Sequence, residues 1–322
     1  MLDCYSGLED PTQAAICMDL QQTLVTPRIS TNEAYYKRKI WTYNFGIHDL
    51  TRGIHPVMYV WNEAVAKRGS CEIGSCLMHF VEHFIPESVS KLAIFSDNCP
   101  GQNKNVNLTL QLLRFVHSQR FGLVKHYFLM PGHSFMPCDQ DFGNLENFFQ
   151  KQEIYTTDHY VELMREARQQ NRFTVVEMTS DMFVDLLPLQ SHCSKTQLAK
   201  AKFKEGRLFI YKADYKEGLR IHHTYFEDKD NEVPQKVKLQ KGRSRTYNPD
   251  IFDLSSVELP KKYPHGVALN PDKLADLNDL LRYIPLQYKG WYNDLFTAQG
   301  LIDANQETPD DPEIQDDDYL DY

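Results

Sequence analysis

The sequence predicts an α/β protein that is built around a mixed β-sheet. Three strand-like segments come first, before any segment with a helical pattern. Strand-like and helix-like segments then alternate as far as about residue 152. Such alternation is typical of parallel sheets covered by helices, whereas the consecutive strands at the start favour an antiparallel portion.

Five segments have the composition of strands. They are short runs of apolar, β-branched or aromatic residues, and polar or turn-forming residues bound them. The predicted strands are Ala14–Leu20, Tyr35–Ile47, His55–Trp61, Lys91–Ser96 and Val124–Met130. Asp19 therefore lies in the first of these strands, and Asp97 directly follows the fourth.

Three further segments repeat apolar residues every three or four positions, which predicts amphipathic helices. They are Ser70–Ile85, Val106–Gln119 and a segment that begins near 141–144, after a polar loop at Pro131–Gln140. The resulting order, βββαβαβα, is that of a ribonuclease H-like core. We therefore expect a mixed five-stranded sheet in which the first and fourth strands are adjacent and parallel.

Pattern and charge divide the chain into three parts. We predict a ribonuclease H-like core in 1–155, an α+β region in 156–306 and a disordered acidic tail in 307–322. The tail has eight acids and no Lys or Arg, so it has too little apolar surface to offset its ordering entropy. Residues 195–245 carry fourteen Lys or Arg against seven acids, which indicates either an irregular solvated surface or a patch that faces nucleic acid.

The composition narrows the class of protein. With 42% apolar and 25% charged residues it is ordinary for a globular chain, and no run of 18 apolar residues predicts a membrane span. The first residues lack the basic and apolar regions of a signal peptide. Seven cysteines, an odd number scattered along the chain, favour a reducing compartment. We therefore expect an intracellular protein with no membrane partner.

Carboxylates stand where such a core would bring them together. The first and fourth strands are neighbours, and the helix after the fifth strand crosses the same edge. Here Asp19 and Asp97 fill the first two positions, and Asp139, Asp141 or Glu146 fills the third. Clustered carboxylates repel one another unless a cation joins them, and Mg²⁺ or Mn²⁺ takes such oxygen ligands. The combination predicts a divalent-metal site suited to displacement at phosphorus, although Asp97 taken alone is more typical of a turn or a helix cap.

Four strings of residues add a resemblance to this interpretation. MDLQQTL, IWTYNFGIHD, FSDNCPGQNKN and GHSFMPCDQDFGNLE together resemble a family of transposon-derived animal proteins with a DDE/D transposase core. The resemblance implies metal-dependent strand transfer or cleavage on DNA, with Asp19 as the first acid and Asp97 as the second. The string PCDQDFGNLENFF is similar to the PDLNPIENLW type of other DDE transposases, which makes Glu146 the first choice for the third acid, Asp141 the second and Asp139 the third.

Four residues near the acids are candidates for accessory roles. Gln102, Asn103 and Lys104 could contact a DNA phosphate at a helix N-terminus, or they could cap that helix. His133 could position a water or a phosphate, or it could be a loop histidine that is bonded to backbone.

The chain also departs from a complete transposase. Such enzymes carry a DNA-binding module before the core, whereas the first predicted strand here begins at Ala14. We therefore expect a truncated or domesticated copy, with a catalytically inactive nucleic-acid or protein binding module as the alternative. Lys236–Arg245 could contact DNA, direct the protein to the nucleus, or act as a linker. DNA is the expected partner; self-association and a protein partner for the acidic tail stay open.

Overall fold

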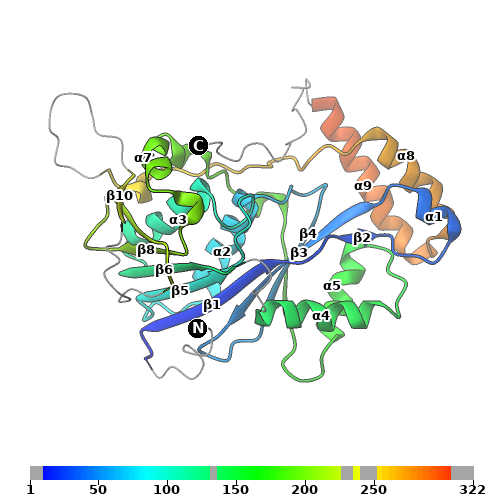
Figure 1. Cartoon of the computed structure of the whole chain (residues 1–322). Coiled ribbons are helices and arrows are strands. Elements are labelled where there is room, and N and C mark those ends of the chain that lie inside the picture. The colour runs from blue at the N-terminus through cyan, green and yellow to red at the C-terminus, as the bar shows by residue number, and fades with distance from the viewer. Residues whose placement is uncertain (1–9, 131–135, 226–234, 240–251, 306–322) are drawn as a thin grey trace.

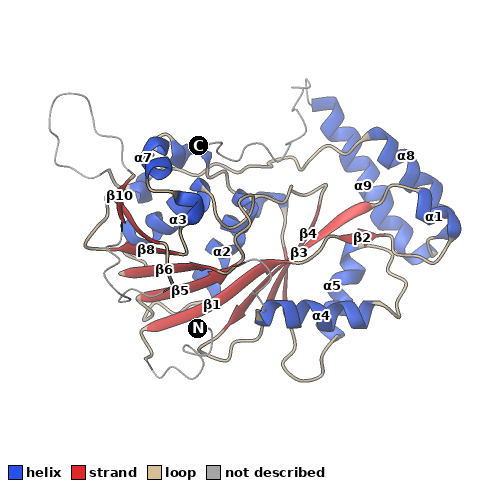
Figure 2. Ribbon diagram, in the orientation of Figure 1, coloured by secondary structure: helices blue, strands red, loops and turns tan. Residues whose placement is uncertain are grey.

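The computed structural model describes residues 10–130, 136–225, 235–239 and 252–305. A single large sheet runs through the molecule, with helices on both of its faces (Figures 1 and 2). Within the described ranges, no helix is both long and apolar enough to cross a membrane. The predicted acidic tail, His133 and the segment 240–245 lie outside the described residues.

The sheet has ten strands in the part of the chain that the structure describes. They are β1 (Gln13–Leu20), β2 (Leu24–Thr26), β3 (Ile40–Asp49), β4 (Val57–Asn62), β5 (Lys91–Ser96), β6 (Leu123–Phe128), β7 (Thr174–Glu177), β8 (Leu208–Lys212), β9 (Gly218–His222) and β10 (Gln235–Lys238). Their order across the sheet is β10-β9-β8-β6-β5-β1-β3-β4-β7, and β2 pairs with β3.

The directions of the strands make the sheet mixed. β3 is antiparallel to β1 and to β4, whereas β5 is parallel to β1 and β6 is parallel to β5. β7 adds a parallel strand beside β4, and β8, β9 and β10 extend the other edge as antiparallel strands. The predicted α/β class is confirmed. The sheet is wider than the five strands expected, because strands from beyond residue 155 join both of its edges.

The helices connect these strands or follow them. They are α1 (Asn32–Tyr36), α2 (Ser70–Phe84), α3 (Val106–His117), α4 (Pro137–Phe149), α5 (Thr157–Glu166), α6 (Leu187–Gln190), α7 (Lys195–Lys200), α8 (Pro271–Leu280) and α9 (Leu286–Asn305). Short 3₁₀ turns occupy Ser180–Met182, Phe203–Glu205, Leu254–Ser256 and Leu281–Tyr283.

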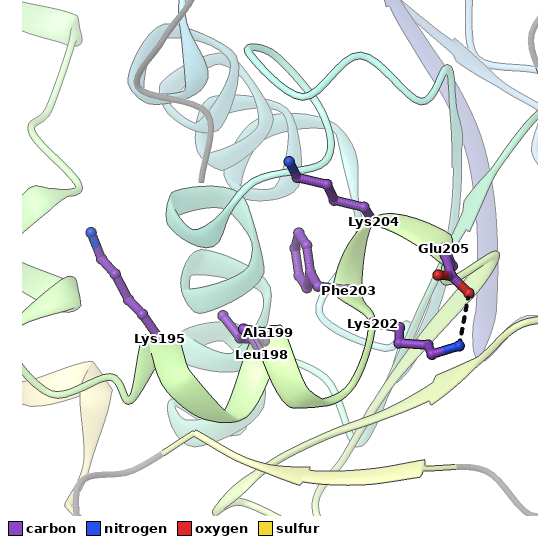
Figure 3. A pocket seen from close by; sticks show the side chains of 7 residues that line it. All are labelled: Lys195, Leu198, Ala199, Lys202, Phe203, Lys204 and Glu205. Atoms are coloured by element: carbon purple, nitrogen blue, oxygen red, sulfur yellow. Dashed lines mark ion pairs between the residues drawn. The ribbon is translucent and has the colours of Figure 1, made fainter. Parts of the chain in front are cut away.

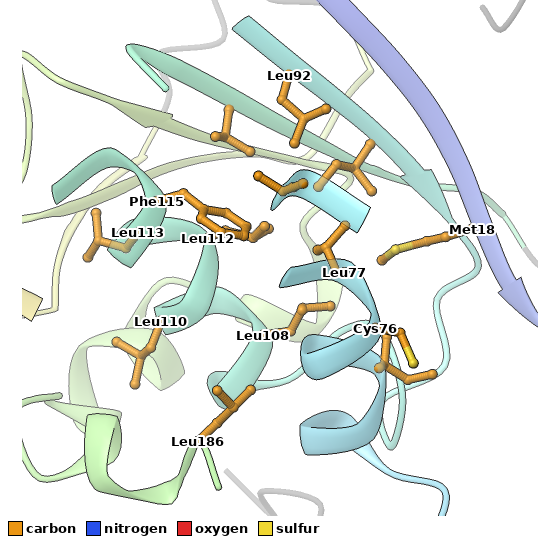
Figure 4. Packing of buried hydrophobic residues seen from close by; sticks show 14 of the residues in the cluster. Met18, Cys76, Leu77, Leu92, Leu108, Leu110, Leu112, Leu113, Phe115 and Leu186 are labelled. Carbon is orange, nitrogen blue, oxygen red and sulfur yellow. The ribbon is translucent and has the colours of Figure 1, made fainter. Parts of the chain in front are cut away.

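Alternation along the strands sends side chains into two separate cores. On β1, Ala14, Ile16 and Met18 pack with α2 and α3, as Figure 4 shows for Met18. Ala15 and Cys17 point to the other face and pack with α4 and α5. Successive residues of a strand point to opposite faces, so a strand buried on both sides is apolar throughout. The buried run at the start of β1 is apolar for this reason.

A third core joins α8 and α9 to the start of β3. It contains Ile40, Leu269, Leu277, Ile284, Tyr292 and Leu295. Lys37, directly after α1, binds Asp276 and Asp279 of α8 at 3.1 and 2.6 Å. Asn270 caps α8, because its side chain accepts a hydrogen bond from the backbone N–H of Asp272.

Two predicted boundaries are wrong, and helix capping explains both. The predicted strand Tyr35–Ile47 begins only at Ile40, because Thr31 accepts the backbone N–H of Ala34 and starts α1. The third predicted helix begins at Pro137 rather than near 141–144. Proline suits a first helical turn, and the Asp139 carboxylate accepts the backbone N–H of Met136 at 2.6 Å.

Candidate active site

Asp19 and Asp97 meet at the carboxyl ends of two neighbouring parallel strands. The pairing of β1 with β5 sets Cys17 opposite Phe95. Two residues further along each chain, Asp19 and Asp97 come level, and neighbouring strands lie about 4.8 Å apart. Because side chains alternate, both aspartates share the sheet face of Cys17 and Phe95, over which α4 lies.

The pKa of Asp19 reflects the charges of the neighbouring acids. Burial and, second, the neighbouring charge of Asp97 raise the pKa of Asp19 to about 7. Asp139 adds a smaller effect in the same direction, while the backbone N–H of Leu20, 2.8 Å from Asp19 Oδ1, opposes it. A carboxyl group with such a raised pKa, next to other carboxylates, is typical of a functional site.

The turn after β5 folds back onto Asp97. Asp97 Oδ1 accepts hydrogen bonds from the backbone N–H of Cys99 at 3.1 Å and from Asn103 Nδ2 at 2.5 Å. Asn103 is buried, and its Oδ1 has no hydrogen-bond partner in the described part of the chain; the same is true of Asn98 Oδ1. The turn therefore fixes Asp97 and holds unpaired amide oxygens beside it.

Helix α4 brings two further acids to this edge, each held differently. Asp139, in the first turn, caps the helix, and its charge reaches Asp19. Glu146 lies seven residues later, which places it on the same side of the helix two turns away. Its carboxylate is exposed and accepts a hydrogen bond from Gln21 Nε2 at 3.1 Å. Of the two, Asp139 is the charged neighbour of Asp19.

Asp141 belongs to a separate ion-pair cluster. It is almost fully buried, with His48 Nδ1 2.7 Å from its Oδ2 and an Arg168 guanidinium nitrogen 2.9 Å from its Oδ1. Residues two positions apart on a helix point about 200° apart, so Asp141 and Asp139 face different directions. The charge of Asp141 is already balanced, which leaves it poorly suited to join Asp19 and Asp97.

The accessory candidates also separate. Asn103 contacts Asp97 directly, and Gln102 is half-buried in the same turn. Lys104 is buried, and its ammonium donates to the carbonyls of Lys204 and Gly206 at 2.6 and 2.7 Å. Burial lowers the pKa of Lys104 to about 8, and the neighbouring charge of Arg207 contributes. Lys104 therefore holds two chain segments together, and its position differs from that of the expected phosphate contact.

Three neighbours of the acids, Gln21, Asn44 and Cys17, were missed from the sequence. Gln21 connects Glu146 to Asn44, whose Nδ2 donates to Gln21 Oε1 at 2.9 Å. The sulfurs of Cys17 and Cys138 lie 3.3 Å apart and join β1 to α4. Alternation along β1 offers a signal for Cys17 and Gln21, because both share a face with Asp19. The position of Asn44 near the acids could be predicted only from the pairing of β3 with β1, which the sequence does not reveal.

The surface pockets lie elsewhere. One is formed by α7 and the 3₁₀ turn after it, and none of the acids lines it (Figure 3). Its walls include Phe203, Lys204 and the ion pair between Lys202 and Glu205, 3.6 Å long. A second pocket beside α1 is lined by Tyr35 and Tyr36. Neither of these two pockets is lined by Asp19, Asp97, Asp139 or Glu146.

The oxygen donors suit a hard divalent cation that is completed by its substrate. Within the described ranges, no three His, Cys, Asp or Glu side chains lie close enough together to hold a metal ion by themselves. Mg²⁺, however, usually takes one or two carboxylates, keeps several waters and takes substrate phosphates as further ligands. Asp19 and Asp97 supply two carboxylates, and the mutual repulsion that raises the pKa of Asp19 is what a cation would relieve.

Comparison with known proteins gives one match. No curated protein and no solved structure matches the chain. The model of the family described as Domain of unknown function (DUF7869) matches residues 40–217, which is more than half of the 322 residues. The matched segment runs from β3 past β8 and includes Asp97 and α4, whereas β1 with Asp19 precedes it. The chain therefore belongs to the family described as Domain of unknown function (DUF7869).

Proposed function

We propose that this protein is a transposase-derived, divalent-metal-dependent polynucleotidyl transferase or nuclease that acts on DNA. The observation that carries the proposal is the level placement of Asp19 and Asp97 on neighbouring parallel strands, beneath α4. The raised pKa of Asp19 supports it, since the fold keeps two acids close at a cost in stability.

The order of five strands supports a ribonuclease H-like core. Taken alone, β1, β3, β4, β5 and β6 have the order β4-β3-β1-β5-β6. The first three are antiparallel neighbours, and the last two run parallel to β1. This is the arrangement expected from the element order of the sequence, with α4 as the helix that crosses the acid-bearing edge. β2 and β7 to β10 are additions to that core.

The residues divide the work of such a site. Asp19 and Asp97 would hold the metal, which supplies electrostatic stabilisation of the attacking and leaving oxygens at phosphorus. Asn103 positions Asp97 through its 2.5 Å hydrogen bond. The third acid is Glu146 by resemblance and Asp139 by electrostatics. Single variants Asp139→Asn and Glu146→Gln separate these two, because only the one that removes a metal ligand should abolish activity.

A nicking assay tests the proposal. Supercoiled plasmid is incubated with the full chain in Mg²⁺ or Mn²⁺, and open circles are quantified. We expect metal-dependent nicking that falls at least about 100-fold in Asp97→Asn, which corresponds to about 2.7 kcal/mol of transition-state stabilisation. Asp272→Asn is the matched control, because Asp272 is an exposed aspartate on α8, far along the chain from the acids. Equal nicking by Asp97→Asn and Asp272→Asn would overturn the proposal.

A catalytically inactive binding module is the second candidate. The contact of Glu146 favours it, because this acid binds the neutral amide of Gln21 and is not among the charges that raise the pKa of Asp19. In that case the chain binds DNA or a protein but nicks nothing in either metal. Action on DNA also implies a nuclear location, for which the basic stretch Lys236–Arg245 is the candidate signal.

A further inference from the structure

The half of the sheet from β5 to β10 has a one-sided charge. Its five strands contain six Lys or Arg residues and no Asp or Glu. The six are Lys91, Lys125, Lys212, Arg220, Lys236 and Lys238. Intervening residues such as Leu92, Val124, Phe209, Leu219 and Val237 pack in the core with α2 and α3. All six cations therefore point to the opposite face, which is the face of α4.

The strand register aligns these cations in rows. Lys125 pairs with Ile210, Ile210 with Arg220, and Arg220 with Lys236. This row of four residues crosses β6, β8, β9 and β10, and three strand spacings make it about 14 Å long. A second row, two residues away along the strands, contains Lys91 opposite Leu123 and Leu123 opposite Lys212.

The rows lead toward the acids. Along β5, Lys91, Ala93, Phe95 and Asp97 point to the same face in succession. Phe95 stacks on Tyr127 with 4.7 Å between the ring centres, between the cationic rows and Asp97. The face thus passes from cations, over an aromatic pair, to the two carboxylates. The cationic part is the left half of the sheet in Figure 1, where β5, β6, β8 and β10 are labelled.

Three of the six cations form ion pairs with acids in the part of the chain that the structure describes. Asp10 lies 3.3 Å from Lys91, Asp214 3.7 Å from Arg220 and Glu217 3.2 Å from Lys238. The five strands themselves contribute six cations and no carboxylate to this face. Aligned positive charge at the rim of a site attracts polyanions and raises their rate of association.

We propose that this cationic face, defined by Lys91, Lys125, Lys212, Arg220, Lys236 and Lys238, binds the phosphate backbone of duplex DNA and leads it to Asp19 and Asp97. The inference rests on the proposed function, since leading DNA along the rows has a purpose only if Asp19 and Asp97 act on it. Nucleic acid fits better than an acidic protein because its charges are regular and because its phosphates are also what a metal on Asp19 and Asp97 would engage.

The test compares two triple variants that remove the same charge. The first changes the row, Lys125→Gln/Arg220→Gln/Lys236→Gln, and the second changes Arg165→Gln/Lys261→Gln/Lys289→Gln on other surfaces. Binding of a labelled duplex is followed by fluorescence anisotropy in EDTA across a salt series. Each lost phosphate contact removes about 0.9 from the log–log salt slope. We expect the row variant to lower this slope by about two to three, and the control variant to leave it unchanged.

Each outcome decides between alternatives. Equal slopes for both triples overturn the inference, because then only net charge matters. Displacement of the duplex by poly-glutamate at equal charge concentration also overturns it, in favour of an acidic protein partner. If the row triple fails to fold, Lys236→Gln/Lys238→Gln on exposed positions of the edge strand β10 replaces it, with an expected slope change of about two. Binding is measured without a divalent metal, so it does not depend on nicking. If the protein binds DNA through the row but does not nick it, the proposed function fails and the binding inference holds. If the protein nicks DNA but the row variant binds it unchanged, the binding inference fails and the proposed function holds.

Discussion

Asp141 and Asp19, two acids near the start of helix α4, have neighbouring charges of opposite sign. Asp141 is a residue of α4, and each of its carboxylate oxygens contacts a basic side chain: His48 contacts one and Arg168 the other. Asp19 lies on β1, and its charged neighbours are the acids Asp97 and Asp139. Asp141 is almost fully buried and Asp19 is half-buried, and the charges that surround them have opposite signs.

This difference has opposite consequences for stability. A buried charge with well-placed partners is strongly destabilising to disrupt, because the partners are left uncompensated. A buried acid next to other acids instead costs stability that the rest of the fold must supply, and such costs collect at functional sites. Asp141 on α4 is therefore an acid that stabilises the fold, whereas Asp19 on β1 is one that lowers its stability.

The largest expected effect on stability is that of Asp141→Ala. It removes the partner of both His48 and Arg168, each of which is mostly buried, and we expect the free energy of unfolding to fall by about 3 kcal/mol. Urea unfolding at pH 7 measures it. Asp272→Ala on exposed α8 should change the same quantity by less than about 0.5 kcal/mol. A loss for Asp141→Ala no larger than this would show that the ion-pair cluster adds nothing to the fold.

The substitution Asp19→Asn is expected to raise the free energy of unfolding, whereas Asp141→Ala lowers it. The pKa of Asp19 in the folded protein, about 7, is above its ordinary value of 3.8, so the folded state binds this proton more tightly than the unfolded state. The wild type therefore loses stability as the pH rises from about 4 to 7, and the penalty is complete above pH 7. Without metal, we expect Asp19→Asn to be more stable by about 2 kcal/mol at pH 8 and by almost nothing at pH 4.

Asp276→Asn supplies a control of reversed direction. The backbone N–H of Arg38 and then the ammonium of Lys37 hold the pKa of Asp276 below its ordinary range. Its contribution is present above the unfolded pKa and disappears as the pH falls through the folded one, so this variant should be less stable at pH 8 and similar to the wild type in acid. A stability difference for Asp19→Asn that does not vary with pH would contradict the interpretation of the site.

Much of the central sheet was predictable from local pattern. Lys91–Ser96 is a strand at exactly the predicted residues, since an apolar run between polar turns has few alternatives. The placement of Asp19 and Asp97 near the carboxyl ends of their strands was predicted in the same way. The widening of the sheet at this edge was not predictable, because β8 pairs with β6 across more than 80 residues of sequence, and β9 and β10 then add to β8. Local periodicity contains no information about such partners.

The order of preference for the third acid shows the same limit. The sequence placed Asp139, Asp141 and Glu146 on a helix near one edge of the sheet. The side chains that contact each of these acids, however, come from segments distant in sequence. Arg168 lies beyond α5, and Gln21 lies at the end of β1, so neither contact could be read from the 139–146 segment. Asp139 rose in importance only because its charge reaches Asp19 in the folded chain.

The smallest expected effect concerns the neighbour that holds Asp97 rather than the acids themselves. Asn103→Ala removes the 2.5 Å hydrogen bond to Asp97 Oδ1, although the backbone N–H of Cys99 remains. Loss of such a supporting contact typically lowers metal affinity by about tenfold or more. We therefore expect the Mn²⁺ concentration for half-maximal nicking to rise by about tenfold, with activity restored at high Mn²⁺.

Asn105→Ala is the matched comparison for that effect, because it lies in the same turn but does not touch Asp97. Asn105 caps α3 by accepting the backbone N–H of Leu108 at 2.9 Å, and its loss should cost about 1 kcal/mol of stability. If Asn103 has only a structural role, both variants will be less stable and neither will alter the Mn²⁺ requirement. A shift confined to Asn103→Ala would instead assign it to positioning Asp97, since a general loosening of the turn would affect both variants alike.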